Sequence, residues 1–215
     1  MAGSRTGPVS ILANGASLKN HDLSKLGATF GMNRSWQLVP APDYHIVADL
    51  NHRAARPDVY EKLSKTGVLF TLGAGWANGA NLRIRHARVH GQMVFSDDIT
   101  QGVSLGRGSI GTVAYSALQV AVWLGFDPIY FLGLDLGGPH FHGDWLPNPD
   151  IAAKQGPIFQ FAADHIKTRK PPLTRPMVWN VGSPASACTA FPKLTFEEAF
   201  PAAETAISAE FTPVG

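Results

Sequence analysis

The segment Asn14-Gly15-Ala16-Ser17-Leu18 has the composition of an anion-binding loop. It follows the apolar run 9–13, which has the length and composition of a strand. A strand that ends in a small, glycine-containing turn before a helix presents free backbone N–H groups, and the helix dipole adds positive potential at the same place. The pattern predicts that Asn14, Gly15 and Ser17 bind a phosphate. An ordinary strand-to-helix turn capped by Ser17 is the alternative interpretation.

Polar residues also stand at the ends of later apolar runs. Asn33, Asp49 and Asp135 each end, or closely follow, a run of strand length. In open α/β sheets the ligand lies beyond the carboxyl ends of the strands. We therefore expect these three residues to share one binding crevice with Asn14. Asn and Asp also favour turns for local reasons, so a set of unconnected turn residues is the alternative.

A second small-residue helix start occurs at Ser109-Ile110-Gly111-Thr112. Ser109 is placed to cap the helix that follows, and the free N–H groups of the first turn would point toward the same edge of the sheet. We predict that Ser109, Gly111 and Thr112 contribute to the phosphate site. A capped helix with a glycine for close packing explains the same residues without a ligand.

Three histidines are candidates for acid–base chemistry. His140 and His142 lie in an aperiodic segment from about 137 to 157 that is rich in Gly, Pro, His and Trp, and long irregular inserts are usually functional. Histidine is the natural general base near neutral pH. We predict His142 as the base and His140 as the second choice. His165 falls in a predicted helix and is assigned a structural role; surface histidines without a role are the alternative.

An alternative role for some of these residues is metal binding. His140, His142 and Asp144 could ligate a divalent cation together with Asp135. In an enzyme that uses a nucleoside triphosphate, Asp49 and Asp135 would hold magnesium through the phosphates. We predict no resident metal and no cofactor, with magnesium required only if the protein uses such a nucleotide.

The elements that must position these residues form an alternating pattern of apolar, strand-length runs and helix-like segments. This pattern is typical of a Rossmann-like α/β fold, a mostly parallel sheet flanked by helices. We predict one nucleotide-binding domain over 1–215, with an irregular lid at about 137–157 and a frayed tail at about 208–215. Strands are expected at 9–13, 28–33, 44–48, 67–72, 129–134 and 177–181, and helices at 17–26, 53–65, 111–124, 157–167 and 195–206.

Composition limits the classes of function. The 215 residues are 45% hydrophobic and 16% charged, which suits one domain with a sizeable core. The 18 basic and 16 acidic residues leave a formal net charge of +2, which excludes a broad polyanion-binding surface as the main activity. The single cysteine permits no internal disulfide and favours a reducing compartment. The N-terminus does not resemble a signal peptide, and no run approaches the roughly 20 apolar residues of a membrane span. We expect a cytoplasmic protein.

A basic run, Arg83-Ile84-Arg85-His86-Ala87-Arg88, lies within the poorly patterned stretch from 73 to 108. It could bind an acidic acceptor or the carboxylate of a sugar. Charged residues also protect the exposed edge of a sheet from pairing with another chain. We expect a solvated edge strand here.

Three blocks of the sequence resemble bacterial sialyltransferases that use CMP-sialic acid. The block at 9–35 holds the Asn-Gly-x-Ser-Leu loop and Asn33, the block at 109–136 ends at Asp135, and a closing block occupies 178–198. The same blocks are similar to two relatives of these enzymes, the flagellin motility accessory factors and the archaeal 6-hydroxymethylpterin diphosphokinases.

This resemblance implies roles for residues of the first block. Asn14, Gly15 and Ser17 match the loop that holds the nucleotide phosphate and the donor sugar. Asn33 matches an asparagine that contacts the donor. Asp49 stands where the sialyltransferases tend to have an asparagine near the cytidine ribose.

The second block implies further contacts and shows two departures from the family. Gly111 and Thr112 fall within about one residue of the Thr-Ser-Gly helix start of these enzymes, and Arg107 is the nearest match to the arginine before it. Asp135 matches the aspartate after a Gly-hydrophobic pair. The two lid tyrosines of the sialyltransferases are missing from the insert, and their lid histidine lies further downstream than the histidines found here.

The function that the resemblance implies is a glycosyltransferase of the sialyltransferase-like class. Its donor would be a nucleotide-activated, CMP-linked sugar and its acceptor a glycan, with no nucleic-acid partner. A second hypothesis is an ATP- and magnesium-dependent enzyme like the pterin diphosphokinases, which the missing tyrosines favour. A third is a nucleotide- or sugar-binding protein without catalysis.

Overall fold

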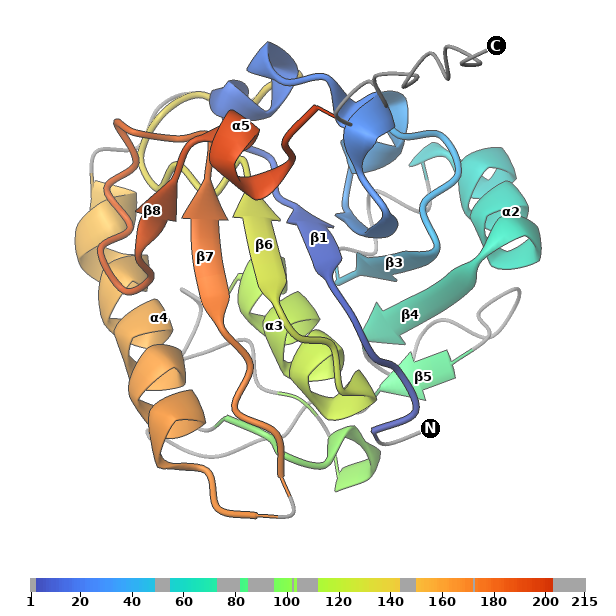
Figure 1. The fold of residues 1–215 in the computed structure, drawn as a ribbon. Helices are drawn as coiled ribbons and strands as arrows, with labels where there is room; N and C mark the ends of the chain where they lie inside the picture. Colours follow the sequence, from blue (N-terminus) through green and yellow to red (C-terminus); the bar gives the residue numbers. More distant parts are fainter. Residues whose placement is uncertain are drawn as a thin grey trace, which may run out of the picture.

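Eight parallel strands form a single sheet (Figure 1). The computed structural model describes residues 3–48, 55–72, 82–84, 95–101, 103, 112–143, 150–171 and 173–202. The strands are β1 (Val9–Leu12), β2 (Ala28–Met32), β3 (Tyr44–Val47), β4 (Val68–Leu72), β5 (Leu82–Ile84), β6 (Ile129–Leu132), β7 (Val178–Val181) and β8 (Lys193–Leu194).

The strand order is β5-β4-β3-β2-β1-β6-β7-β8. The chain adds β2 to β5 outward on one side of β1, and then returns to add β6, β7 and β8 on the other side. The order therefore reverses between β1 and β6. In sheets of this kind, ligands bind at such a switch point, beyond the carboxyl ends of the strands.

The central strand β1 is buried along its whole length. Val9 lies opposite Ala28 of β2 on one side and opposite Ile129 of β6 on the other. A parallel strand covered on both faces needs apolar residues at successive positions, which is why these runs stand out in the sequence. The expected Rossmann-like α/β fold is confirmed.

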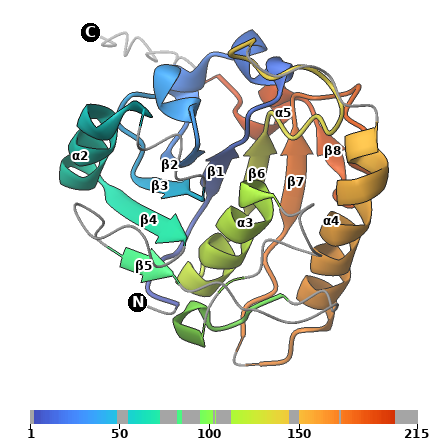
Figure 2. The same cartoon turned by 180° about the vertical axis from the view of Figure 1, so that it is seen from behind.

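Helices cover both faces of the sheet. Figure 2 shows α3 (Val113–Leu124) and α4 (Asp150–Thr168) side by side on one face, where they pack over residues such as Ile11 and Phe131. On the opposite face, α2 (Pro57–Thr66) packs against Val47 and Leu69. Helix α5 (Phe196–Ala199) lies on the same face, over β1, β6 and β7. A second apolar cluster fills the space beneath it, and its buried members are Leu12, Leu18, Leu132, Phe141, Val181 and Phe196.

Among the helices, α3 is the one whose bounds the sequence predicted best. It was expected over 111–124 and spans Val113–Leu124, and nearly all of its side chains are buried. Its N-cap is Thr112, whose hydroxyl accepts a hydrogen bond from the Ala114 N–H at 3.3 Å, so the expectation of a cap at Ser109 is wrong. Gly125 ends the helix in the left-handed conformation (φ 96°), which glycine adopts without strain.

The segment expected as a helix over 17–26 forms two 3-10 turns instead, η1 (Ala16–Asn20) and η2 (Leu23–Lys25). The side chain of Asp22 accepts a hydrogen bond from the Ser24 N–H between them. Such Asp-centred local bonding offers the backbone an alternative to a continuous helix. The loop at 14–18 therefore does not open an α-helix.

The irregular segment expected over 137–157 ends earlier than predicted, because α4 begins at Asp150 and contains Pro157 in its interior. Burial of Ile158, Phe159 and Ala162 outweighs the lost backbone hydrogen bond. The sequence did not predict the short strand β8. Helix α5 ends at Ala199, whereas a helix extending to about 206 was expected. No helix among the described residues is both long and apolar enough to cross a lipid bilayer.

Candidate functional site

A cavity of about 610 Å³ opens at the carboxyl ends of β1, β2 and β6, at the switch point of the sheet. Its lining comes from the loops after these strands, from the first turn of α3 and from the start of α4. The described residues that line it are Ala13, Asn14, Gly15, Met32, Asn33, Arg34, Ala48, Thr112, Val113, Ala114, Gly133, Leu134, Asp135, Leu136, Gly137, Gly138, His140, His142, Ile151 and Gln155.

Most of the site residues predicted from sequence meet at this cavity. Seven of them line it: Asn14, Gly15, Asn33, Thr112, Asp135, His140 and His142. Ser17 stands behind the lining, with its hydroxyl hydrogen-bonded to Asp135 at 2.5 Å. Asp49, Ser109 and Gly111 lie outside the described residues.

The N-terminal loop (residues 14–18) does not offer the free backbone donors that were expected. The Gly15 N–H bonds the Gly133 carbonyl at 2.8 Å, and the Ala16 N–H bonds the Pro139 carbonyl at 3.1 Å. The Ser17 N–H donates to the Asp135 carboxylate at 2.9 Å. All three N–H groups are thus hydrogen-bonded to the loop after β6, so the prediction that they are free to bind a phosphate is wrong. Within this loop, the Asn14 side chain is therefore the group best placed to contact a ligand.

Gly15 is required by close packing against Asp135. A Cβ atom at position 15 would lie 2.4 Å from the Asp135 Cγ and 2.4 Å from the Gly133 carbonyl oxygen. Only glycine fits where two backbones and a carboxylate meet at such distances. The glycine of the motif is thus explained by its packing against the loop after β6.

The segment 139–142 is held against this loop by backbone pairing. The Phe141 N–H donates to the Asn14 carbonyl at 2.8 Å, and His140 forms an antiparallel bridge with Gly15. Phe141 is buried in the apolar cluster under α5. Residues 140–143 form a turn, in which the Gly143 N–H donates to the His140 carbonyl at 3.0 Å. The turn buries Phe141 and leaves His140 and His142 at the cavity, with ring centroids 5.1 Å apart.

Asn33 has a left-handed backbone conformation at the end of β2. Its φ is 46°, in the left-handed region that non-glycine residues seldom occupy. The Tyr60 hydroxyl donates to its carbonyl at 3.2 Å, and its own N–H bonds the Ile46 carbonyl at 3.3 Å. These two bonds hold the turn that presents the Asn33 side chain to the cavity.

Two amide oxygens at the site have no protein partner within the described part of the chain. They are Oδ1 of Asn14 and Oδ1 of Asn33, and both atoms are buried. Buried polar atoms in proteins are nearly always hydrogen-bonded, so an unmet oxygen is a feature that needs a reason. A ligand in the cavity that carries hydrogen-bond donors would give each of these two oxygens a partner.

Sequence reasoning missed two polar lining residues, Arg34 and Gln155. Arg34 directly follows Asn33 at the end of an apolar run, so the position that singled out Asn33 also indicated Arg34. Among the described lining residues it is the only arginine or lysine, which makes it the fixed positive charge of the site. Gln155 was hidden because it fell in the predicted lid, whereas it belongs to the first turns of α4.

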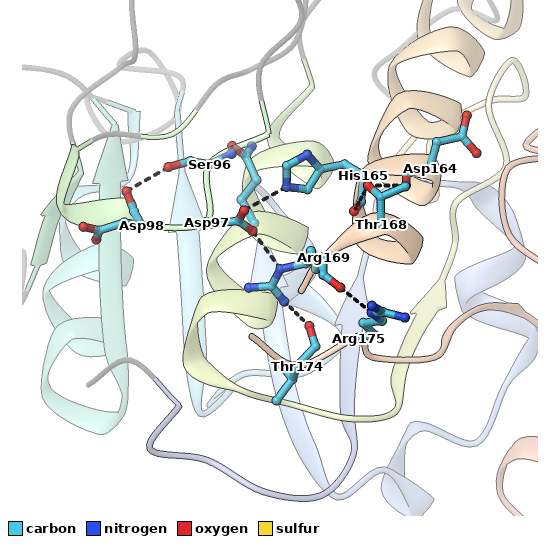
Figure 3. Close-up of polar contacts among 10 residues, drawn as sticks. Ser96, Asp97, Asp98, Asp164, His165, Thr168, Arg169, Thr174 and Arg175 are labelled. Carbon is cyan, nitrogen blue, oxygen red and sulfur yellow. Dashed lines mark hydrogen bonds and ion pairs between the residues drawn. The ribbon is translucent and has the colours of Figure 1, made fainter. Parts of the chain in front are cut away.

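His165 lies in a separate polar cluster at the C-terminal end of α4 (Figure 3). The cavity touches the other end of that helix, at Ile151 and Gln155. The Nε2 atom of His165 is 2.9 Å from Oδ2 of Asp97, and its ring stacks on Phe95. The other carboxylate oxygen of Asp97 pairs with Arg169 at 2.7 Å. The cluster ties the segment 95–101 to α4, in keeping with the structural role expected for His165.

Among the described residues, no three or more His, Cys, Asp or Glu side chains are arranged to hold a metal ion. Asp144 of the hypothetical four-ligand set lies outside those residues. Asp135, a member of the same set, already accepts hydrogen bonds from Ser17 and Ser183.

Comparison with known proteins yields a likeness of fold. No protein-family model matches the chain, and no curated protein matches its sequence. Among solved structures, the MAf glycosyltransferase from Magnetospirillum magneticum AMB-1 is similar, with a TM-score of 0.57 and 14% sequence identity. The match covers 95% of this chain and 36% of the other, so this chain spans about a third of its neighbour's length. It shows a shared α/β fold.

Proposed function

We propose that the protein is a glycosyltransferase that uses a nucleotide-activated sugar, with a CMP-linked sugar as donor. The observation that carries this proposal is the cavity at the switch point, where two asparagines, an arginine and two histidines meet. The fold shared with a protein named as a glycosyltransferase supports the reaction class. The choice of CMP rests on the resemblance of the Asn14, Asn33 and Asp135 blocks to the sialyltransferases.

In this proposal the cavity holds the donor by its polar lining. The Asn14 and Asn33 amides contact the phosphate and the sugar, and Thr112 contributes from the start of α3. Arg34 balances the negative charge of the donor, because a guanidinium pairs well with phosphate or carboxylate oxygens. We assign Asp49 to the ribose, and Ser109 and Gly111 to the phosphate, as the resemblance implies.

The reaction needs a base and a stabilised leaving group. The acceptor hydroxyl oxygen attacks the anomeric carbon while the bond from that carbon to the phosphate oxygen breaks, and the nucleotide departs with the bonding electron pair. His142 takes the proton of the hydroxyl, with His140 as the alternative base. Positive charge and oriented dipoles around the departing phosphate supply much of the rate enhancement.

The kinase-like alternative receives less support from the site. It requires Asp135 as a magnesium ligand, and both oxygens of that carboxylate already accept hydrogen bonds from serines. A divalent cation at this carboxylate would compete with hydrogen bonds to both of its oxygens.

Replacing His142 by Gln tests the proposed chemistry. We expect the release of CMP from a CMP-linked sugar to fall by about 10²-fold or more, because the general base is lost, while the affinity for CMP stays within a factor of about two. Product analysis measures the first quantity and calorimetry the second. His21→Gln is a matched control at a histidine outside the cavity lining.

Two outcomes of this experiment would count against the proposal. Full turnover by the His142→Gln and His140→Gln variants would remove the histidines from the mechanism. Binding of CMP with no turnover by the wild-type protein, over a panel of CMP-linked sugars with glycan acceptors, would leave a binding protein without catalysis.

A further inference from the structure

Asp135 is the residue at which three loops of the sheet edge meet. It follows β6, and its carboxylate accepts three hydrogen bonds from the loops after the two neighbouring strands. The Ser17 N–H reaches Oδ2 at 2.9 Å, and the Ser17 hydroxyl reaches Oδ1 at 2.5 Å. The Ser183 hydroxyl, from the loop after β7, reaches Oδ1 at 2.6 Å. Hydrogen bonds to an ionised carboxylate are among the stronger ones in proteins.

The backbone of Asp135 is fixed as firmly as its side chain. Its carbonyl accepts the Ala187 N–H at 2.9 Å. The preceding carbonyl, of Leu134, accepts the Ser186 hydroxyl at 2.5 Å and the Asn180 side chain at 3.3 Å. The loop after β7 therefore holds the carboxylate in one place, and the carboxylate in turn holds the loop after β1.

This arrangement leaves Asp135 poorly suited to touch the donor. Both of its oxygens point at serines, and a carboxylate placed beside a phosphate would repel it. The carboxylate also lies against Gly15, where a Cβ atom would come within 2.4 Å of it. What the carboxylate does fix is the course of residues 15–17, and with it the position of Asn14 at the cavity.

We propose that Asp135 is a positioning residue that acts on donor binding through Ser17, and that it contacts neither the donor nor a metal. This inference rests on the proposed function only for the identity of the ligand. Ser183 has a related role, because the hydrogen bond from its hydroxyl to Oδ1 helps keep the Asp135 carboxylate oriented toward the N-terminal loop.

A double-mutant cycle tests the proposal, with CMP as the probe and calorimetry as the readout. Asp135→Asn keeps the size of the side chain but turns an NH₂ group toward the Ser17 N–H or toward the two hydroxyls. We expect it to weaken CMP binding roughly tenfold. Ser17→Ala should weaken binding by a smaller factor, and the double variant should bind no worse than Asp135→Asn alone, because the two residues act as one unit.

Asp22 provides a matched control. Its carboxylate also accepts a backbone N–H and a hydroxyl from one serine, Ser24, at 3.2 and 2.5 Å, but it is exposed and lies outside the cavity lining. Asp22→Asn should leave CMP affinity unchanged. If Asp135→Asn fails to fold, Ser183→Ala takes its place, with a smaller loss in the same direction.

Amide hydrogen exchange separates this inference from the proposed function. Asp135→Ala, which leaves no acceptor at the position, should speed exchange at the Ser17 N–H, whether or not the protein binds CMP, whereas Asp22→Ala should affect Ser24 alone. Unchanged exchange at Ser17 overturns the positioning role. Additive losses in the cycle, or Mg²⁺-dependent CMP binding that Asp135→Asn abolishes, overturn it as well. A wild-type protein that ignores CMP would refute the donor assignment but leave the exchange result to decide the role of Asp135.

Discussion

At the scale of single residues, Asn33 is supported from beneath by buried side chains that do not reach the cavity. Tyr60 donates to its carbonyl, and the ring of Tyr60 packs edge-on against His45, with centroids 5.9 Å apart. His45 is only 1% exposed. Burial lowers the pKa of His45 to about 3, and the nearby Asn33 backbone opposes this only in part. The folded protein therefore holds His45 neutral near pH 7.

This buried histidine predicts a pH dependence of stability. Below pH 6.5 the histidine of the unfolded chain binds a proton and the buried one does not, so stability falls as the pH drops from 6.5 toward 3. The loss from this group is about 1.4 kcal/mol per pH unit at most, or about 2 kcal/mol between pH 6.5 and 5. Urea unfolding of wild type and His45→Leu at both pH values measures it.

The difference between the two proteins isolates His45 from the other titrating groups. The variant should lose less stability than the wild type over this interval. Equal losses in the two proteins would show that His45 is protonated in the folded state.

At the scale of elements, the C-terminal end of α4 is tied to the segment 95–101 by a partly buried ion pair. Arg169 has a side chain that is 3% exposed, and it pairs with Asp97, which also contacts His165 (Figure 3). The same guanidinium donates to the Thr174 carbonyl. Removing one partner of a buried pair leaves the other charge uncompensated, which costs more than an exposed pair contributes.

Replacing Arg169 by Met should therefore lower the free energy of unfolding by about 1 to 2 kcal/mol, less than for a fully buried pair, because the Asp97 side chain is 32% exposed and keeps its contact with His165. Chemical denaturation measures this directly. Arg56→Met is the matched control, because Arg56 pairs with Asp58 on the surface, where both side chains are more than half exposed, and it should change stability little. Equal effects of the two substitutions would show that the Arg169 pair adds nothing to the attachment of α4.

The elements that could be predicted from sequence are those with strong internal signals. Helix α3 and strands β1 and β6 are buried, apolar and bounded by turn residues. The elements that were missed or misplaced lack such signals. Strand β8 has two residues, and the start of α4 was concealed by Pro157, whose usual place is a first helical turn.

At the scale of the whole molecule, topology explains why residues far apart in the chain meet at one cavity. The reversal of strand order between β1 and β6 brings the loops after positions 12, 32 and 132 to one edge of the sheet. Strand-end asparagines and aspartates therefore pointed to the position of this cavity from sequence alone. The hydrogen-bonding state of those residues could not be predicted in this way, because it depends on partners such as Ser183, Gly133 and Pro139 in other loops.

The most direct test of the account is calorimetric titration of the wild-type protein with CMP, in EDTA and in Mg²⁺, beside ADP, ATP and UDP. We predict binding of CMP that is independent of the metal and tighter than that of the other nucleotides, and roughly tenfold weaker in Asn33→Ala. Binding of ATP alone and only with Mg²⁺, or no binding of any nucleotide, would contradict the assignment of this cavity to a CMP-linked donor.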